Sequence, residues 1–228
     1  VSDIQYETLS TSINGYTTYL VKVNIGENGS NIYALAGNTE QTLNIPPSYQ
    51  VPAPFGTDIG GVSAALVEVN PDAEFDSWIT IGIEDGDPGG ALSSIGIDFS
   101  SWTDTAGLNI NDGAIFWMDP ANGPGENNIQ IAQLTIPNNA NNRTFEGILQ
   151  GRSTGQRADW QTSFTIDLPV PSESSVVNST NAEAEQTAAE AAAAQAAANA
   201  AAQAAANAAA QAAANAAAQA AAAAAQAA

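Results

Sequence analysis

The sequence predicts a mainly β protein: an antiparallel β-sandwich of jelly-roll or immunoglobulin-like type, followed by a long C-terminal alanine-rich α-helix. Three observations support this fold class. Before residue 168, short segments rich in β-branched and aromatic residues recur about every 8–12 residues, with Gly, Pro, Asn and Asp between them. No stretch of about 10–15 residues before residue 180 has helical periodicity, which argues against a βαβ architecture. Residues 191–228 consist of 30 alanines and 8 Asn or Gln residues, and alanine has the highest intrinsic helix propensity.

The first clear strand is Tyr16–Ile25, in which Tyr19, Val21, Val23 and Ile25 alternate on one face. The dipeptide Asn28-Gly29 separates it from a second run, Asn31–Gly37. Asn-Gly between two such runs is a strong hairpin signal. We therefore expect these two strands to pair.

A proline-rich stretch, Ile45–Phe55, follows. Proline cannot donate to a strand ladder, so this stretch is expected to be a long surface connection. The later strand-like segments bring the expected total to nine or ten; they are Gly61–Val69, Phe75–Ile83, Leu92–Phe99, Ala114–Met118, Ile129–Ile136, Thr144–Leu149 and Trp160–Leu168. Residues 1–168 are predicted to form one acidic sandwich domain.

The four tryptophans are Trp78, Trp102, Trp117 and Trp160. We expect them to pack in the core or at its rim. The alternative is a platform on which sugar rings stack, and it would need two of them exposed on one face.

Composition excludes several kinds of site. The 228 residues carry 24 acidic and 4 basic side chains, a net charge of −20, with no His and no Cys. The chain therefore has no Ser-His-Asp triad, no Cys-His dyad, no ordinary zinc or copper site and no disulfide. The four basic residues are too few to neutralise phosphates, so nucleic acid is not an expected partner. They are Lys22, Arg143, Arg152 and Arg157, and the arginines are expected to form ion pairs with the many acids.

The loop Glu84–Gly90 is the most charge-dense. Alternate carboxylates with glycine at the bend can fold oxygens around a calcium ion, although the EF-hand spacing is absent. Asp85 and Asp87 are the candidate ligands, and calcium is the only cofactor that the sequence suggests. The alternative is that Asp and Gly are simply the residues that tight turns require.

We do not expect an enzyme. A glycosidase needs two carboxyl groups about 5–10 Å apart, and with 21 acidic residues before residue 181 some pair meets that distance by chance.

Residues 169–180, rich in Pro, Ser and Asn, are predicted to be a linker. Thr180 and Glu183 then match a capping box, and residues 181–228 are predicted to form one helix about 70 Å long. No membrane-spanning segment is expected, because an amide at every fourth position would leave polar groups in lipid.

The tail carries a regular row of amides. A four-residue step advances about 40° around a helix, so the amides form a slowly winding row on a surface of methyl groups. We expect the tail to bind copies of itself; a solvated spacer and an ice-binding helix are the alternatives. The residues of the row are Gln195, Asn199, Gln203, Asn207, Gln211, Asn215 and Gln219.

Three Asn-x-Ser/Thr sequons begin at Asn28, Asn142 and Asn178, all in predicted turns or linkers. They are candidate glycosylation sites. Together with the acidic, lysine-poor composition and a first residue that is Val, they favour an extracellular protein or one at a cell or virion surface.

The phrases Asp112–Asp119 and Gln150–Ser153 resemble uncharacterised β-rich modules in surface proteins of marine microbes, algae and large algal viruses. The resemblance covers about residues 60–165, contains no active-site motif and implies an exterior structural or adhesive role. The expected function is that of a surface structural protein that assembles into a filament or appendage through its tail. The alternative is a carbohydrate- or calcium-dependent adhesion module on a helical stalk.

Overall fold

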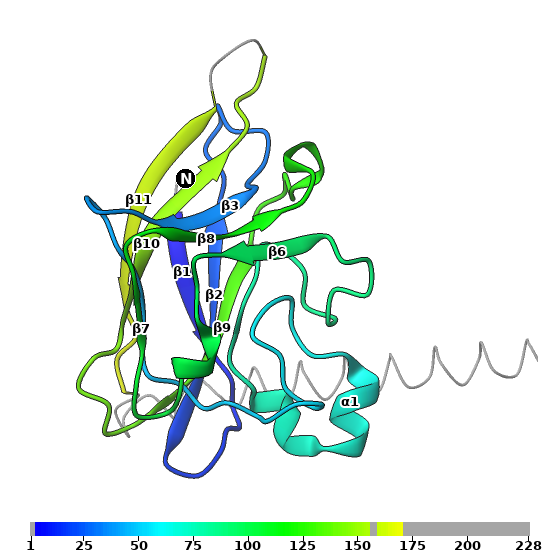
Figure 1. Cartoon of the computed structure of the whole chain (residues 1–228), viewed down its shortest axis with the longest axis vertical. Coiled ribbons are helices and arrows are strands. Elements are labelled where there is room, and N and C mark those ends of the chain that lie inside the picture. The colour runs from blue at the N-terminus through cyan, green and yellow to red at the C-terminus, as the bar shows by residue number, and fades with distance from the viewer. Residues whose placement is uncertain (1–2, 156–158, 171–228) are drawn as a thin grey trace, which may run out of the picture. The chain divides into compact units, whose positions relative to one another are not determined.

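The computed structural model describes residues 3–155 and 159–170, which belong to the first of the chain's two units, Val1–Pro171. They form two antiparallel sheets with a short α-helix beside them (Figure 1). The prediction of a mainly β domain with paired antiparallel sheets is therefore confirmed. The linker after Val170, the predicted helix 181–228 with its amide row, the sequon at Asn178 and Arg157 all lie outside the described residues.

The smaller sheet has four strands, all paired antiparallel. A register shift between Val21 and Lys22 interrupts the pairing of its two central strands. In spatial order the strands are β1 (Asp3–Thr8), β2 (Tyr16–Asn24), β9 (Ile129–Pro137) and β5 (Trp78–Ile79).

The larger sheet has seven strands, again all antiparallel. β11 lies on one side of β10, whereas β3 and β4 lie one after the other on its opposite side. The strands are β6 (Leu92–Ile95), β8 (Gly113–Trp117), β3 (Ala34–Gly37), β10 (Thr144–Gly151), β4 (Leu43–Ile45), β7 (Leu108–Ile110) and β11 (Trp160–Asp167).

β3 and β4 pair with the same side of β10 and together form one interrupted strand. β8 pairs with β3 and β7 pairs with β4, so β7 and β8 form a second interrupted strand beside the first. Where both strands are interrupted, Gly37 faces Gly113. A Cβ on Gly37 would lie 2.1 Å from the Ile110 carbonyl oxygen and 2.3 Å from the Leu43 nitrogen. Only glycine lets the two interrupted strands approach this closely.

The core lies between the sheets. Tyr19, Val21 and Val23 are fully buried on one face of β2, as their alternation predicts, and Ile25 packs against the same core. Other fully buried core residues on the strands of the two sheets include Leu134, Ile136, Leu35, Leu43, Ile115, Phe145 and Leu149. Burial of this many large aliphatic and aromatic side chains is the main term that stabilises the domain.

A third layer covers the outer face of the smaller sheet. It contains α1 (Ala64–Val69) and a 3-10 helix, η1 (Pro71–Phe75), and in Figure 1 α1 stands apart from both sheets, on the side of β9. The Gln133 amide of β9 donates to the carbonyl oxygens of Glu74 and Asp76 at 2.8 and 2.7 Å. Because this layer covers its outer side, every residue of β9 is buried. Two further 3-10 turns, η2 (Phe99–Ser101) and η3 (Pro120–Asn122), lie in loops.

Two strand predictions are wrong. Gly61–Val69 was expected to be a strand, but it contains α1, in which the helix formers Ala64, Ala65 and Leu66 follow the extended residue Ser63. Phe75–Ile83 keeps only the two residues of β5 as strand. Its first residue belongs to η1, and its end is a turn in which the Thr80 hydroxyl accepts from the Ile83 N–H at 3.0 Å.

The predicted hairpin at Asn28-Gly29 is also wrong. The Gly29 N–H donates to the Gly26 carbonyl at 2.8 Å, so a turn is present. It leads from β2 in the smaller sheet to β3 in the larger one, however, and the two strands do not pair with each other. The proline-rich stretch forms no strand after Ile45, but Ser48 and Val51 within it are buried. The short strands β1, β4 and β7 were not predicted.

Candidate functional site

The four tryptophans divide into two pairs. Trp78 and Trp102 are buried, as expected for packing residues. Trp117 and Trp160 are half-buried, and each fixes its indole N–H on a carbonyl oxygen: Trp117 on Ile81 and Trp160 on Arg152, both at 2.9 Å. A platform of two fully exposed tryptophans on one face is not present among the described residues. Trp160 lines a surface pocket at the end of the larger sheet, and the buried Trp78 lines a different one.

The Trp160 ring lies against the backbone of its cross-strand partner, Gly151. A Cβ on Gly151 would come within 2.3 Å of the indole Cζ2 and 2.5 Å of Cε2. The indole thus covers the space that the missing side chain of Gly151 leaves on the sheet. This packing, with the hydrogen bond to the Arg152 carbonyl, holds the ring in one orientation.

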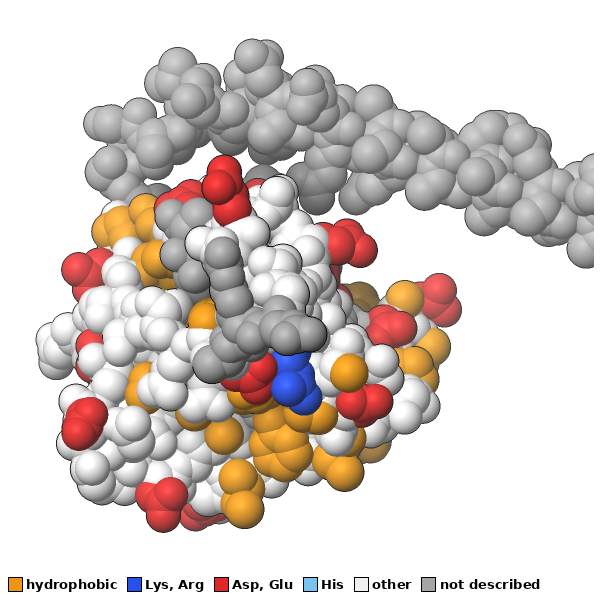
Figure 2. Space-filling model, turned by 90° about the horizontal axis from the view of Figure 1, so that it is seen from above, with side chains coloured by type: hydrophobic (Ala, Val, Ile, Leu, Met, Phe, Trp, Pro, Cys, Tyr) orange, Lys and Arg blue, Asp and Glu red, His pale blue; other side chains and the backbone are white. Residues whose placement is uncertain are grey.

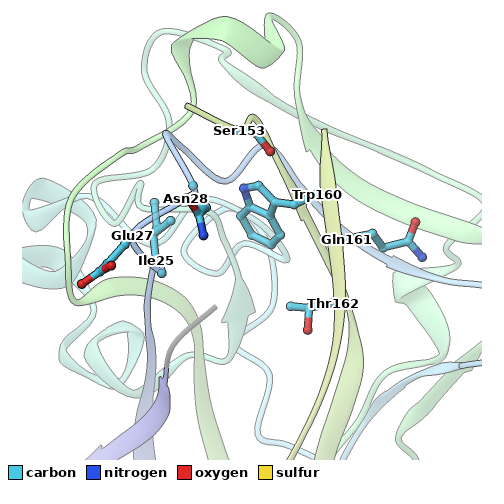
Figure 3. Close-up of a pocket in the computed structure, with 9 residues that line it drawn as sticks. Ile25, Glu27, Asn28, Ser153, Trp160, Gln161 and Thr162 are labelled. Carbon is cyan, nitrogen blue, oxygen red and sulfur yellow. The ribbon is translucent and has the colours of Figure 1, made fainter. Parts of the chain in front are cut away.

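The other wall of the pocket is the turn after β2, as Figure 3 shows. The Thr154 N–H donates to the Asn28 carbonyl oxygen at 2.9 Å and ties this turn to the end of β10. The pocket has a volume of about 240 Å³, and its lining consists of Ile25, Gly26, Glu27, Asn28, Gly29, Ser153, Trp160, Gln161 and Thr162. An aromatic surface flanked by amide, hydroxyl and carboxylate groups can bind a small polar ligand with an apolar face, such as one sugar ring.

Arg152, directly after β10, is at the centre of a charged cluster at the end of the larger sheet. Its guanidinium lies 3.3 Å from the Asp159 carboxylate and 5.8 Å from the centre of the Tyr33 ring. The Tyr33 hydroxyl donates to the same carboxylate at 3.3 Å, and burial together with that carboxylate raises the Tyr33 pKa. On the face that Figure 2 presents, acidic side chains are widely scattered, and basic side chains are confined to one place, beside acidic and hydrophobic ones. The predicted ion pair of Arg152 is present, but both partners are exposed and such a pair contributes little stability.

Within residues 3–155 and 159–170, Arg143 forms no ion pair, contrary to expectation. Its guanidinium donates instead to the carbonyl oxygens of Leu168 and Pro137, at 2.7 and 2.6 Å, and to the Tyr19 hydroxyl at 2.8 Å. No sequence pattern predicts this arrangement, because two of the acceptors are backbone carbonyl oxygens and the third, the Tyr19 hydroxyl, is 124 residues away in the chain.

The loop with the calcium candidates is organised by its own hydrogen bonds. Asp87, with φ of +47°, accepts from the Ala91 and Leu92 N–H groups, each at 2.8 Å. The backbone of Asp85 forms an isolated antiparallel β-bridge with that of Gly61. The described residues contain no group of three or more acidic side chains placed to hold a metal ion. The geometry is that of a closed turn, and calcium at Asp85 and Asp87 stays a prediction.

Two of the sequons lie on the surface. Asn28 and Asn142 are both exposed. The Asn142 side-chain oxygen accepts from the Thr144 N–H at 3.1 Å, just before β10. A glycan on Asn28 would leave the chain at the edge of the Trp160 pocket.

Asp76 is a buried carboxylate that sequence reasoning missed. Its two oxygens accept from the N–H groups of Val51 and Thr57, each at 2.7 Å, and it is fully buried. Burial raises its pKa to about 7, although the backbone hydrogen bonds oppose the shift. Since it has no access to solvent, its role is to hold the proline-rich stretch against β5.

Comparison with known proteins adds nothing to this description. No family model, no curated protein and no solved structure matches the chain. The resemblance to β-rich surface modules therefore stays a prediction. Among the described residues, no helix has both the length and the apolar character needed to span a membrane.

Proposed function

We propose that this chain is a structural protein of an extracellular or surface assembly, in which the alanine-rich C-terminal segment binds copies of itself as a helix and the β domain is displayed. The proposal rests first on composition. Residues 191–228 have no charge, and alanine methyl groups let neighbouring helices approach closely, which adds dispersion contacts along their length.

The observation that carries the proposal further is the attachment of the chain where it leaves the domain. Arg143 donates to the Leu168 carbonyl oxygen, and the Tyr19 hydroxyl donates to the carbonyl oxygen of Pro169. Leu168 is itself fully buried. The end of β11 is thus fixed to both sheets, as a domain held in an assembly through its C-terminal segment requires.

Exposed sequons support an exterior location. Asn28 and Asn142 are accessible for glycan attachment on the described surface. The net charge of −20 on each chain makes displayed copies repel one another, which limits non-specific association.

The test is a triple substitution in the full chain, Ala205→Glu, Ala209→Glu and Ala213→Glu. Glutamate keeps helix propensity nearly intact, but burying unpaired carboxylates between helices is costly. The parent should sediment as a large species and form particles or fibres in negative stain, whereas the triple variant should sediment as a monomer. The tryptophan fluorescence should be unchanged, because all four tryptophans lie before residue 168 and report on the folded β domain alone.

The matched control replaces the same three alanines with glutamine, which has the size of glutamate without its charge. Assembly in the glutamine variant and its loss in the glutamate variant would show that an uncharged, buried tail surface is required. Monomeric parent protein, or particles that persist in the glutamate variant, would overturn the proposal.

A second function is favoured by the Trp160 pocket: binding of one sugar ring by an adhesion module. A half-buried indole with a fixed orientation stands beside Asn28, Gln161 and Thr162. A glycan array probed with the glutamine variant and with its Trp160→Ala counterpart tests it. Loss of every glycan signal with Trp160→Ala supports sugar binding, and an array without signal for either protein contradicts it.

A further inference from the structure

A second pocket lies between the third layer and the outer face of the smaller sheet. Its volume is about 240 Å³. Leu20 and Gln133 of the sheet form part of its floor, and Val62 and Val67, before and within α1, form part of its wall. It is separate from the Trp160 pocket and shares no residue with it.

Gln130 of β9 makes this pocket unusual. Its side chain is 2% exposed, and it lines the pocket. No hydrogen bond among the described residues uses its side-chain amide, although its backbone carbonyl accepts from the Gly82 N–H at 2.9 Å. Gln130 is not among the buried polar atoms without a partner, which in the described part of the chain are represented by the Gln50 Nε2 alone. Its amide therefore keeps contact with the solvent that fills the pocket, and its polar atoms are open to hydrogen bonds from a ligand.

The polar groups of the pocket are mostly acceptors. The Gln133 amide nitrogen is already committed to two carbonyl oxygens, which leaves its side-chain oxygen as the group it can offer to a ligand. Glu74 and Glu84 add two exposed carboxylates at the rim. Besides these acceptors, the Gln130 amide nitrogen is the side-chain donor left in the lining, apart from the buried indole of Trp78. A ligand that fits must therefore bring hydrogen-bond donors.

The charge of the site also favours a ligand that brings donors, and in particular a cation. The described lining contains no basic residue. Lys22 of β2 is the direct cross-strand partner of Gln130, but its ammonium group lies 2.8 Å from the Glu7 carboxylate, which neutralises it, and it does not line the pocket. With a net charge of −20, the protein attracts cations to such a site. The hydrophobic side chains of Leu9, Leu20 and Val67 offer contact to an apolar chain.

We propose that this pocket binds a small organic cation, a primary alkylammonium ion. Its three N–H donors bond to the side-chain oxygens of Gln130 and Gln133 and to a rim carboxylate, and its short alkyl chain lies against Leu20 and Val67. This inference does not depend on assembly through the tail.

The test is calorimetric titration of the full chain with n-butylammonium chloride. The parent should bind one equivalent per chain. Gln130→Met keeps the volume of the side chain and removes both polar atoms, so binding should weaken at least tenfold. Glu84→Gln, at the exposed rim, should weaken it about threefold, in the range of a partly screened charge contact.

Three controls make the result decisive. Glu40→Gln, in the exposed turn between β3 and β4, should leave binding unchanged. The uncharged n-butanol and sodium chloride should each give no saturable heat. Equal binding of n-butanol, or equal affinity of the parent and a variant that carries both Glu74→Gln and Glu84→Gln, would overturn the proposal even if Gln130→Met failed to fold.

Discussion

The Arg143 guanidinium donates a hydrogen bond to the Tyr19 hydroxyl at 2.8 Å and lies 5.6 Å from the centre of the Tyr19 ring. Tyr19 belongs to β2 in the smaller sheet, whereas Arg143 immediately precedes β10 in the larger one. Burial raises the Tyr19 pKa, and the Arg143 charge opposes that shift. One side chain thus joins the two sheets at the end where the chain leaves the domain.

Arg143→Lys should destabilise the domain by roughly 2–4 kcal/mol, measured by urea unfolding of the full chain. Lysine has no planar fork, so it cannot reach the Leu168, Pro137 and Tyr19 oxygens together. Hydrogen bonds from charged groups are commonly worth about 1.5–3 kcal/mol each. Arg152→Lys, at an exposed ion pair, should cost less than about 1 kcal/mol. Equal effects of the two substitutions would contradict the linking role of Arg143.

Gly151→Ala should cost about 2 kcal/mol or more, because overpacked sites force backbone shifts. The new methyl group would lie 1.9 Å from the Asn31 carbonyl oxygen as well as against the Trp160 ring. Gly89→Ala is the control, since its Cβ meets nothing within 4 Å and its φ is not positive. Tryptophan fluorescence should change with the first variant only. A stable Gly151→Ala protein with parental fluorescence would show that the ring does not depend on Gly151.

The sequence predicted the long strands well because alternation or strand-favouring residues mark each of them. β2, β9, β10 and β11 were all expected within about two residues of their observed ends. In β2, Tyr19, Val21 and Val23 recur with period two, and burial of one face follows from that pattern. The other three are rich in β-branched or aromatic residues, which favour strands. β9 shows the limit of the rule, because both of its faces are covered and its partners could not be known from the pattern.

The failures have a common physical cause, which is that local signals do not specify the distant partner. Asn28-Gly29 forms a turn, but the strands on its two sides join different sheets because each finds a better partner far along the chain. β4 and β7 are three residues long and are strands only because they continue β3 and β8. Trp160 could be selected from the sequence as one of four tryptophans. Its position opposite Gly151 could not be predicted, because it depends on the register in which β10 and β11 pair.

Asp87→Ala should lower the stability of the domain by about 1–2 kcal/mol in chelator and in millimolar calcium alike. The carboxylate accepts from the Ala91 and Leu92 N–H groups, and its removal leaves both donors without that partner. Thermal unfolding in both buffers measures this. A loss that appears only with calcium present would show that Asp87 is a metal ligand and would support the calcium site.

Asp76 should make the domain more stable in mild acid than at neutral pH. Its folded pKa of about 7 exceeds its ordinary value of 3.8. Between these two values the folded state binds a proton that the unfolded state releases. The free energy of unfolding therefore falls as the pH rises from about 4 to about 7, by at most roughly 4 kcal/mol, and this contribution is constant above that range.

Asp76→Asn isolates this effect from the other acidic residues, which contribute equally to both proteins. Asparagine is neutral at every pH, and its NH₂ group would face one of the two N–H donors of Val51 and Thr57. The variant should be less stable than the parent at pH 5, and the difference between the two proteins should shrink by pH 8, where the parent holds a buried charge. Asp72→Asn, exposed on η1, should leave the pH dependence of the parent unchanged. The measurement is urea unfolding at half-unit intervals from pH 4 to 8. A difference between parent and Asp76→Asn that does not vary with pH would show that the Asp76 carboxyl does not titrate in this range.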